Sequence, residues 1–184
     1  MSDQSDGYDK NKDVLLETDA DAIRLAKTLV RTARSGVLAT IEPKSGRPLA
    51  TRVGVSTDID GAPVILTSKL AAHTPALLAD PRCSLFVGQP GKGDPLAHAR
   101  VSLACVAREI ERDSEEHKRV DARYLSHQQK ARRYAALGDF RYFRLEPESA
   151  SLNAGFGRAY ALAGADILTT SPANDELAIR EMDV

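Results

Sequence analysis

The sequence has no long apolar run, only two cysteines and almost no net charge. No stretch approaches the roughly 18 consecutive apolar residues that a membrane-spanning helix needs, so we expect no such helix. Cys83 and Cys105 lie within apolar runs, which is typical of buried small side chains in a reducing compartment. With 25 basic and 26 acidic residues, the chain lacks the basic surplus of a dedicated nucleic-acid binder. The acidic N-terminus does not resemble a secretory signal, so we expect a cytoplasmic protein.

Familiar catalytic and metal-binding motifs are missing as well. The sequence contains no CxxC, HExxH, P-loop or GxSxG pattern. It therefore gives no support for a zinc site, a nucleoside-triphosphate site or the nucleophilic serine of a nucleophile elbow. Gly155-Phe156-Gly157 continues as Arg-Ala-Tyr and fails the dinucleotide-binding fingerprint. The four histidines are scattered, at positions 73, 98, 117 and 127. The motif search therefore assigns no catalytic residue and no metal site.

The length and composition indicate one domain with two polar or weakly patterned ends. A chain of 184 residues with 42% hydrophobic side chains can bury a core of its own. Residues 1–17 are acidic and lack apolar periodicity, which predicts a disordered tail. Residues 18–165 form the predicted domain, and residues 166–184 predict a C-terminal arm on the surface.

Hydrophobic periodicity predicts mostly strands in the central region. A helix is expected from Thr18, which with Asp21 resembles a capping box, to Gly36. Strands are expected over 37–41, 49–57, 63–67, 83–88, 101–110, 141–145 and 150–154. Further helices are expected from His73 or Thr74 (with Thr74 as cap) to Asp80, from Asp113 or Ser114, and from Ser126 to about Leu137. Because regular βαβ alternation is missing, these elements predict a mainly β antiparallel barrel with peripheral helices.

Polar side chains gather between the strand ending near residue 67 and the helix starting near residue 73. They are Thr67, Ser68, Lys69, His73 and Thr74. A helix start offers free backbone N–H groups to an anion, so one interpretation is a phosphate pocket. Arg52 and Ser56, on the polar face of the preceding strand, can converge on the same place. The other interpretation is a helix start with solvated basic neighbours.

The segment from Thr67 to Leu85 resembles the region after the third strand of pyridoxamine 5′-phosphate oxidase-like, FMN-binding split barrels. The resemblance implies a split antiparallel β-barrel that forms a homodimer. It implies that Arg52 contacts the FMN phosphate and that Thr67 contacts the cofactor. His73 and Arg100 fall at the positions of a phosphate-binding lysine and a cofactor-contacting glutamine. The implied cofactor site comprises Arg52, Val53, Ser56, Thr67, Ser68, Lys69, His73, Thr74 and Arg100.

Other segments resemble the haem-utilisation branch of the same family, whose better-known members degrade haem in bacterial iron acquisition. These segments are residues 33–40, 70–74, 93–96, 122–125 and 155–159. Two positions depart from the flavin-binding pattern, because Thr57 and Ala72 stand where the pattern has basic residues. Long members of the haem branch carry a second C-terminal domain that supplies an iron ligand. The sequence reaches Val184 without such a domain, so we do not expect that ligand here.

The resemblance leaves three functional hypotheses. The first is an FMN-binding flavoprotein, an oxidoreductase with FMN at the dimer interface, in which the flavin carries the hydride chemistry. The second is a haem-binding or haem-degrading protein in iron utilisation, with one of the four histidines on the iron. The third is a split barrel that binds a partner without a cofactor. The expected partners are a second copy and a small-molecule substrate or haem, with no nucleic acid and no membrane; the substrate itself is not predicted.

Overall fold

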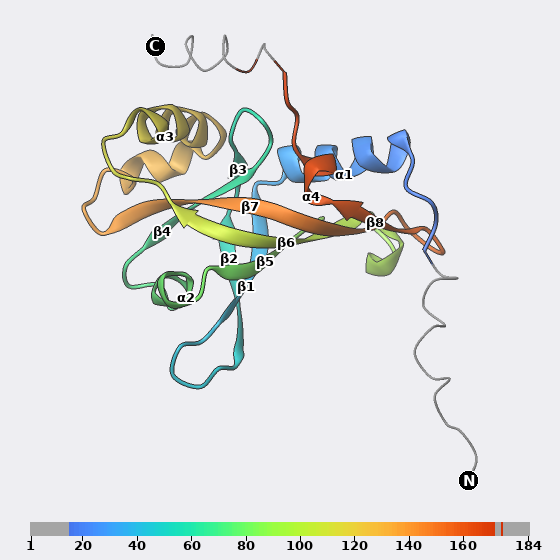
Figure 1. The fold of residues 1–184 in the computed structure, drawn as a ribbon, viewed down its shortest axis with the longest axis horizontal. Coiled ribbons are helices and arrows are strands. Elements are labelled where there is room, and N and C mark those ends of the chain that lie inside the picture. The colour runs from blue at the N-terminus through green and yellow to red at the C-terminus, as the bar shows by residue number, and fades with distance from the viewer. Residues whose placement is uncertain (1–14, 172–173, 175–184) are drawn as a thin grey trace.

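The computed structural model describes residues 15–171 and 174 and contains one curled antiparallel sheet with helices around it (Figure 1). The strands are β1 (Ser35–Ile41), β2 (Pro48–Gly54), β3 (Ser56–Thr57), β4 (Pro63–Ser68), β5 (Arg82–Val87), β6 (Arg100–Glu109), β7 (Phe140–Asn153) and β8 (Ala159–Ala163). The helices are α1 (Ala20–Thr32), α2 (His73–Ala79), α3 (Glu115–His127) and α4 (Gly164–Ile167), with short 3₁₀ helices η2 (Pro95–Ala97) and η3 (Gln129–Arg133). The expected mainly β architecture is confirmed.

The strand order is β2-β1-β5-β6-β7-β4-β3, and β8 pairs with β7 off this path. β7 has 14 residues and lies along the whole of β6. The other edge of β7 pairs with β4 in its first part and with β8 in its last part. β2 also approaches β4, so the sheet curls back toward itself. This arrangement confirms the antiparallel split barrel.

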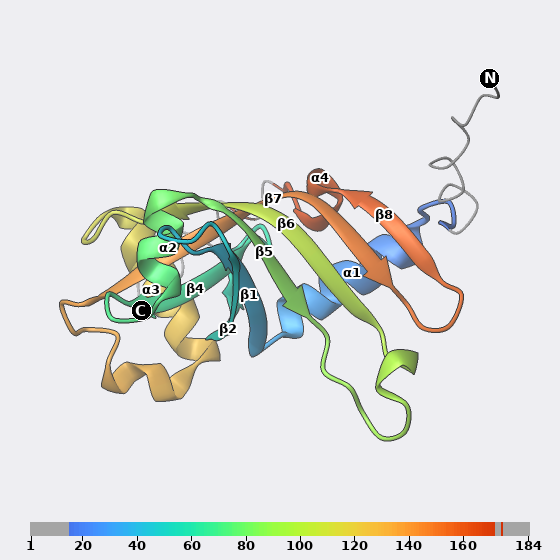
Figure 2. The same ribbon diagram turned by 90° about the horizontal axis from the view of Figure 1, so that it is seen from below.

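One side of the sheet faces the main hydrophobic core. Leu38, Leu85 and Leu103 point to this side from three neighbouring strands, and each is fully buried. α1 covers the same side with residues at helical spacing, including Ala26 and Val30. Figure 2 shows α1 running behind β5, β6 and β7. A second cluster packs α3 against β4 and β7. The side of the sheet facing away from α1 is called the outer face below.

The first helix begins one residue later than expected and has a different cap. Asp19, not Thr18, is the N-cap, because its carboxylate accepts a hydrogen bond from the backbone N–H of Ala22 at 2.7 Å. The Thr18 hydroxyl donates to the carbonyl oxygen of Ala161 instead. The helix also ends at Thr32, before the glycine at position 36 that was expected to stop it.

Three further expectations about elements were wrong. The strand expected over 49–57 is interrupted at Val55, whose N–H donates to Arg34, so that β2 and β3 are separate. The segment 126–137 is not a second α-helix, because α3 itself continues to His127 and only η3 follows. The strands expected over 141–145 and 150–154 are one strand, β7. β8 and α4 had not been predicted.

The two predicted ends of the chain lie mostly outside the described residues. In the predicted acidic tail, residues 1–14 are outside, while Leu15 bridges Ala159 and Leu16 N–H donates to the same residue. The predicted C-terminal arm begins inside α4, and residues 172–173 and 175–184 are outside. Among the described residues, no helix is long and apolar enough to cross a membrane.

The two cysteines are far apart in sequence but directly opposite each other across β5 and β6. Both are free thiols; Cys105 is buried and Cys83 is partly buried. Burial raises the pKa of the Cys83 thiol to about 12 and also raises the pKa of Cys105. Both therefore remain protonated near neutral pH, as expected for small buried side chains.

Candidate functional site

The hydroxyl groups at the junction of β4 and α2 are engaged with their neighbours. The Thr74 hydroxyl donates to the carbonyl oxygen of Ser68 at 2.6 Å and lies 3.0 Å from the Thr67 hydroxyl. The Ser68 hydroxyl donates to the carboxylate of Asp139 at 2.7 Å. Thr74 is not the cap of α2, because the helix begins at His73 without a side-chain cap. A carboxylate therefore lies beside the place where a phosphate pocket was predicted.

His73 is buried on the core side of β2. Its Nδ1 lies 3.0 Å from the Thr51 hydroxyl. Burial lowers the pKa of His73 below its usual value, so the imidazole is neutral at pH 7. A neutral ring offers a phosphate one N–H group but no positive charge.

Arg52 faces away from His73. Successive side chains of a strand point to opposite faces, and Thr51 is the residue of β2 that contacts His73. Arg52 therefore points to the outer face, where it is exposed and stands opposite Val37 of β1. Its position separates it from the polar cluster around Ser68.

The other residues of the predicted cofactor site are distributed over several places. Val53 belongs to the hydrophobic core, and Ser56 is buried beyond the break between β2 and β3. Lys69 is exposed next to the β4–α2 junction. The Arg100 guanidinium donates to the carbonyl oxygens of Leu96 and His98, at 2.9 and 3.2 Å, and so holds the loop between β5 and β6. The structure thus brings together only the residues of the junction, Thr67, Ser68, Lys69, His73 and Thr74.

The outer face carries two rows of side chains that cross six strands, and the side chains of the first row are all small. Cross-strand partners share a face, so the ladder registers define each row. The first row is Ala50, Ala39, Ser84, Ala104, Ser149 and Ala163. The second row is Arg52, Val37, Phe86, Ser102, Ser151 and Ala161. Arg52 is the single charged residue in the two rows; the other members are alanine, serine, valine and phenylalanine.

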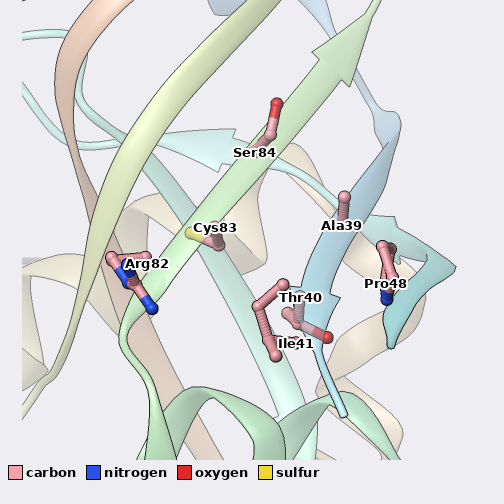
Figure 3. A pocket seen from close by; sticks show the side chains of 7 residues that line it. All are labelled: Ala39, Thr40, Ile41, Pro48, Arg82, Cys83 and Ser84. Carbon is pink, nitrogen blue, oxygen red and sulfur yellow. The ribbon is translucent and has the colours of Figure 1, made fainter. Parts of the chain in front are cut away.

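A cavity of about 350 Å³ opens where β1 and β5 separate. The two strands pair only from Val37 to Ala39, so Thr40 and Ile41 diverge from Arg82 and Cys83. Figure 3 shows these side chains around the opening, with Pro48 on the far side of β1. This cavity borders the first outer-face row through its alanine and serine side chains.

A second hollow of about 260 Å³ lies on the second row and is called the Arg52 groove. Its lining is Ser35, Gly36, Val37, Arg52, Phe86, Val87, Gly88, Gln89 and Pro90. The Gln89 amide donates to the Ser35 hydroxyl at 3.1 Å. Val37 and Phe86 each leave 38% of their surface exposed. Within the described part of the chain, the Arg52 guanidinium has no hydrogen bond or ion pair, so its charge is available to a ligand.

Sequence reasoning did not identify Val37, Phe86 or Gln89 as site residues. Alternation along β5 contains a usable signal, because inward-pointing Leu85 and Val87 leave Phe86 on the opposite face. A single exposed aromatic residue is ordinary, but an apolar patch of neighbouring exposed residues marks a contact surface. The signal becomes informative only when the register also places Arg52 and Val37 beside it.

The comparisons with known proteins agree on the family. Residues 24–154 match the family described as pyridoxamine 5′-phosphate oxidase. A chloroplastic non-canonical haem oxygenase, HOZ of Arabidopsis thaliana, is 29% identical over 139 residues, which are 75% of this chain and 42% of that protein. The haem oxygenase HutZ of Vibrio cholerae is 30% identical over 140 residues, 71% of this chain and 75% of HutZ.

A solved structure described as a haem-binding protein from Mycobacterium smegmatis is 32% identical, with a TM-score of 0.73. The similarity covers 83% of this chain and 61% of that protein. The chain thus spans less than half of the plant relative and under two thirds of the mycobacterial one. The chain belongs to the pyridoxamine 5′-phosphate oxidase-like split barrels and lies close to their haem-utilisation branch.

Proposed function

We propose that this protein binds haem in the Arg52 groove and takes part in haem degradation. The observation that carries the proposal is the free guanidinium of Arg52 beside the exposed apolar side chains of Val37 and Phe86. A porphyrin has two apolar faces and an edge with two carboxylates. Such a ligand needs an apolar wall with a cation at one end, and the groove offers both. The names of the plant and Vibrio relatives, both haem oxygenases, support the same ligand.

Different residues of the groove suit different parts of haem. The apolar side chains suit the porphyrin plane, and Arg52 and Gln89 can donate to the propionates. When bound, haem supplies the iron chemistry, while the protein contributes binding, orientation and electrostatics. A hollow of about 260 Å³ is small beside the roughly 300–1,000 Å³ of pockets for drug-sized ligands. One chain therefore provides only part of the site.

We further propose that a second copy completes the site. The first outer-face row presents small uncharged side chains over six strands, which allows another sheet to approach closely. Val37 and Phe86 remain exposed in one chain and would be covered by such a partner. Obligate interfaces of this kind are closed by two-fold symmetry and place the same surface of each copy in contact.

FMN remains a second candidate ligand, because the charge of Arg52 suits a phosphate as well as a carboxylate. Haem is favoured by the chemistry around the β4–α2 junction. There the Asp139 carboxylate accepts from Ser68, and the neighbouring hydroxyls are already hydrogen bonded. A phosphate dianion would meet this negative charge at the place where the flavin-binding pattern requires donors.

A titration with ferric haem tests the proposal. The purified protein is titrated with hemin and separately with FMN, and the absorption spectrum is recorded at each step. We expect a shifted, saturable Soret band with one haem per chain or per pair of chains. We also expect weak FMN binding and no displacement of haem by excess FMN.

Two results would contradict haem binding. One is a Soret band that grows without saturation, as in nonspecific adsorption. The other is tight FMN binding that excludes haem, which would restore the flavoprotein hypothesis. A heat-denatured sample at equal concentration serves as the reference for nonspecific haem binding.

A further inference from the structure

The Arg52 groove offers binding groups for the plane and the carboxylates of a porphyrin, but none for a metal. Val37 and Phe86 supply an exposed apolar wall, and the Arg52 guanidinium has no partner within the described part of the chain. The Gln89 amide is held at the wall of the groove by its hydrogen bond to the Ser35 hydroxyl. Haem iron in proteins is held by imidazole, thiolate, thioether or phenolate groups. No residue of the lining carries any of these groups.

A second copy placed by two-fold symmetry does not supply the missing group. Two-fold symmetry brings the same surface of each chain into the contact. The two outer-face rows contain alanine, serine, valine, phenylalanine and Arg52, so the opposite chain presents the same residue types. The rows of the second copy therefore offer apolar surface and another guanidinium, but no side chain that coordinates iron.

Two of the four histidines are fixed in the packing of the protein. His73 lies on the core side of β2, where its Nδ1 is 3.0 Å from the Thr51 hydroxyl. His117 stacks edge-on against Tyr142, which belongs to the cluster between α3 and the sheet. Neither histidine lines the Arg52 groove.

The other two histidines are held by backbone carbonyl oxygens. His127 donates from Nε2 to the carbonyl oxygen of Ala33 at 3.1 Å. His98 lies in the loop between β5 and β6, and its Nε2 donates to the carbonyl oxygen of Lys92 in the same loop at 3.0 Å. Neither of them belongs to the lining of the groove, so all four histidines of the sequence lie outside it.

The thiols and the described phenols are placed elsewhere as well. Cys83 borders the other cavity, Cys105 is buried, and burial raises the pKa of both thiols, so neither is a thiolate near neutral pH. The described tyrosines are packed in the hydrophobic clusters or against another ring: Tyr124, Tyr134, Tyr142 and Tyr160. The two methionines and Tyr8 lie outside the described residues.

Binding in the groove therefore depends on parts of the porphyrin that do not change with the metal. The free energy gained at the apolar wall scales with the apolar area that is removed from water on Val37 and Phe86. The Arg52 guanidinium gains a charge-assisted hydrogen bond to a carboxylate. A porphyrin without iron has the same ring and the same carboxylates, so both contributions are the same for it.

We infer that the Arg52 groove recognises porphyrin dicarboxylates as a class, without regard to the metal at their centre. The inference rests on the haem-binding function proposed above and specifies which parts of haem are recognised. A metal-free porphyrin is accordingly a ligand in its own right.

The experiment measures the dissociation constants of ferric deuteroporphyrin and of metal-free deuteroporphyrin, which share the same ring and carboxylates. Wild type is compared with Arg52→Ala and with Arg133→Ala, which removes an exposed arginine of η3 as the matched control. Absorption spectra follow each titration, and circular dichroism checks that each variant is folded. The ferrous nitrosyl complex of wild type is also examined by electron paramagnetic resonance, because a nitrogen ligand opposite the bound NO adds hyperfine splitting.

We expect the two dissociation constants of wild type to differ by less than tenfold. Arg52→Ala should raise both by a similar factor of at least about ten, which corresponds to a lost hydrogen bond to a charged group. Arg133→Ala should raise neither. The nitrosyl spectrum should show splitting from the nitrogen of NO alone.

Four results would overturn the inference. A difference of tenfold or more between the two dissociation constants does so, and where haem still saturates it leaves haem binding intact. Splitting from a second nitrogen in the nitrosyl spectrum has the same meaning, because the protein would then hold the iron. Equal dissociation constants that Arg52→Ala leaves unchanged in a folded protein contradict recognition at the groove. Absence of saturable binding of either form removes the inference together with the proposed function.

Discussion

Arg52 carries the charge on which anion recognition in the groove depends. Its guanidinium has no partner among the described residues, and its neighbours across the ladder are uncharged. If Arg52 were held in an ion pair or a hydrogen bond within the protein, that interaction would have to break before the side chain could bind a ligand. Because none is present in the described chain, the binding energy of a carboxylate is not offset by such a loss.

Replacing Arg52 by alanine should therefore weaken haem binding by roughly 1.5–3 kcal/mol, the usual value of a hydrogen bond to a charged group. Haem dimethyl ester, which lacks the carboxylate charges, should bind wild type and Arg52→Ala almost equally. Arg52→Lys should keep part of the affinity, because the charge remains but the two-pronged geometry is lost. Equal losses for haem and its ester would mean that Arg52 acts on folding or packing.

The sequence predicted which types of residue could bind an anion, but it did not predict how these residues are arranged in space. Arg52 and His73 were both recognisable as anion-binding types, but alternation along β2 places them on opposite faces. Asp139 comes from a segment with no strong pattern, and it reaches Ser68 only through the pairing of β4 with β7. Contacts of this kind depend on long-range register, which local periodicity does not contain.

At the scale of elements, the cap of α1 is set by Asp19. Asp19→Ala removes the acceptor of the Ala22 N–H and should lower the free energy of unfolding by about 1 kcal/mol. Asp19→Asn retains an acceptor oxygen and should cost clearly less. Urea unfolding followed by circular dichroism measures both. A larger effect of Thr18→Ala than of Asp19→Ala would favour the cap that the sequence first suggested.

An ion network joins α3 to the turn before β4 and to β7. The side chain of Asp58, only 4% exposed, accepts from Arg119 at 2.9 Å and from Arg144 at 2.8 Å. Burial alone would raise the pKa of Asp58. The hydrogen bond from Arg119, the Ile59 N–H and the charges of both arginines outweigh burial and hold that pKa below its usual value.

A carboxyl group whose pKa is lowered by folding stabilises the protein above its unfolded pKa of about 3.9, and this contribution is lost as the pH falls through the folded pKa. Asp58→Asn should thus cost roughly 3 kcal/mol at pH 7, with a difference from wild type that shrinks at acidic pH. The control is Glu115→Gln, in an exposed pair with Lys118, which should change little at either pH. A difference that stays constant between pH 7 and acidic pH would contradict the role of the Asp58 charge.

Most strands were predictable because their alternation is local, and the exceptions have local causes as well. β7 was divided in two by Pro147, which interrupts a strand pattern. In the structure, Pro147 stands opposite Cys105 where the pairing of β6 with β7 shifts register, so the strand continues through an irregularity. α4 begins at Gly164, where an added Cβ would lie 1.9 Å from the carbonyl oxygen of Pro147. That close approach requires glycine, but a single glycine does not predict a helix.

At the scale of the whole molecule, the small uncharged side chains of the first outer-face row lead us to expect a two-fold symmetric homodimer. An obligate interface should bury well over about 1,600 Å² in total. Light scattering at micromolar concentration should give the mass of two chains. Ala39→Arg places a charge in the first outer-face row and should yield a folded monomer. Lys118→Ala on α3 is the matched surface control, and a monomeric wild type would contradict the dimer.

The central claim, that haem binds on the outer face at the Arg52 groove, is tested most directly by locating the iron by nuclear magnetic resonance. Ferric haem is paramagnetic and broadens nearby amide signals, whereas the zinc porphyrin does not and serves as the diamagnetic reference. We predict that broadening is strongest for the amides of residues 35–37, 52 and 86–89, which line the groove. Broadening centred on Ser68 and His73 at the β4–α2 junction, with the Arg52 groove unaffected, would contradict the claim.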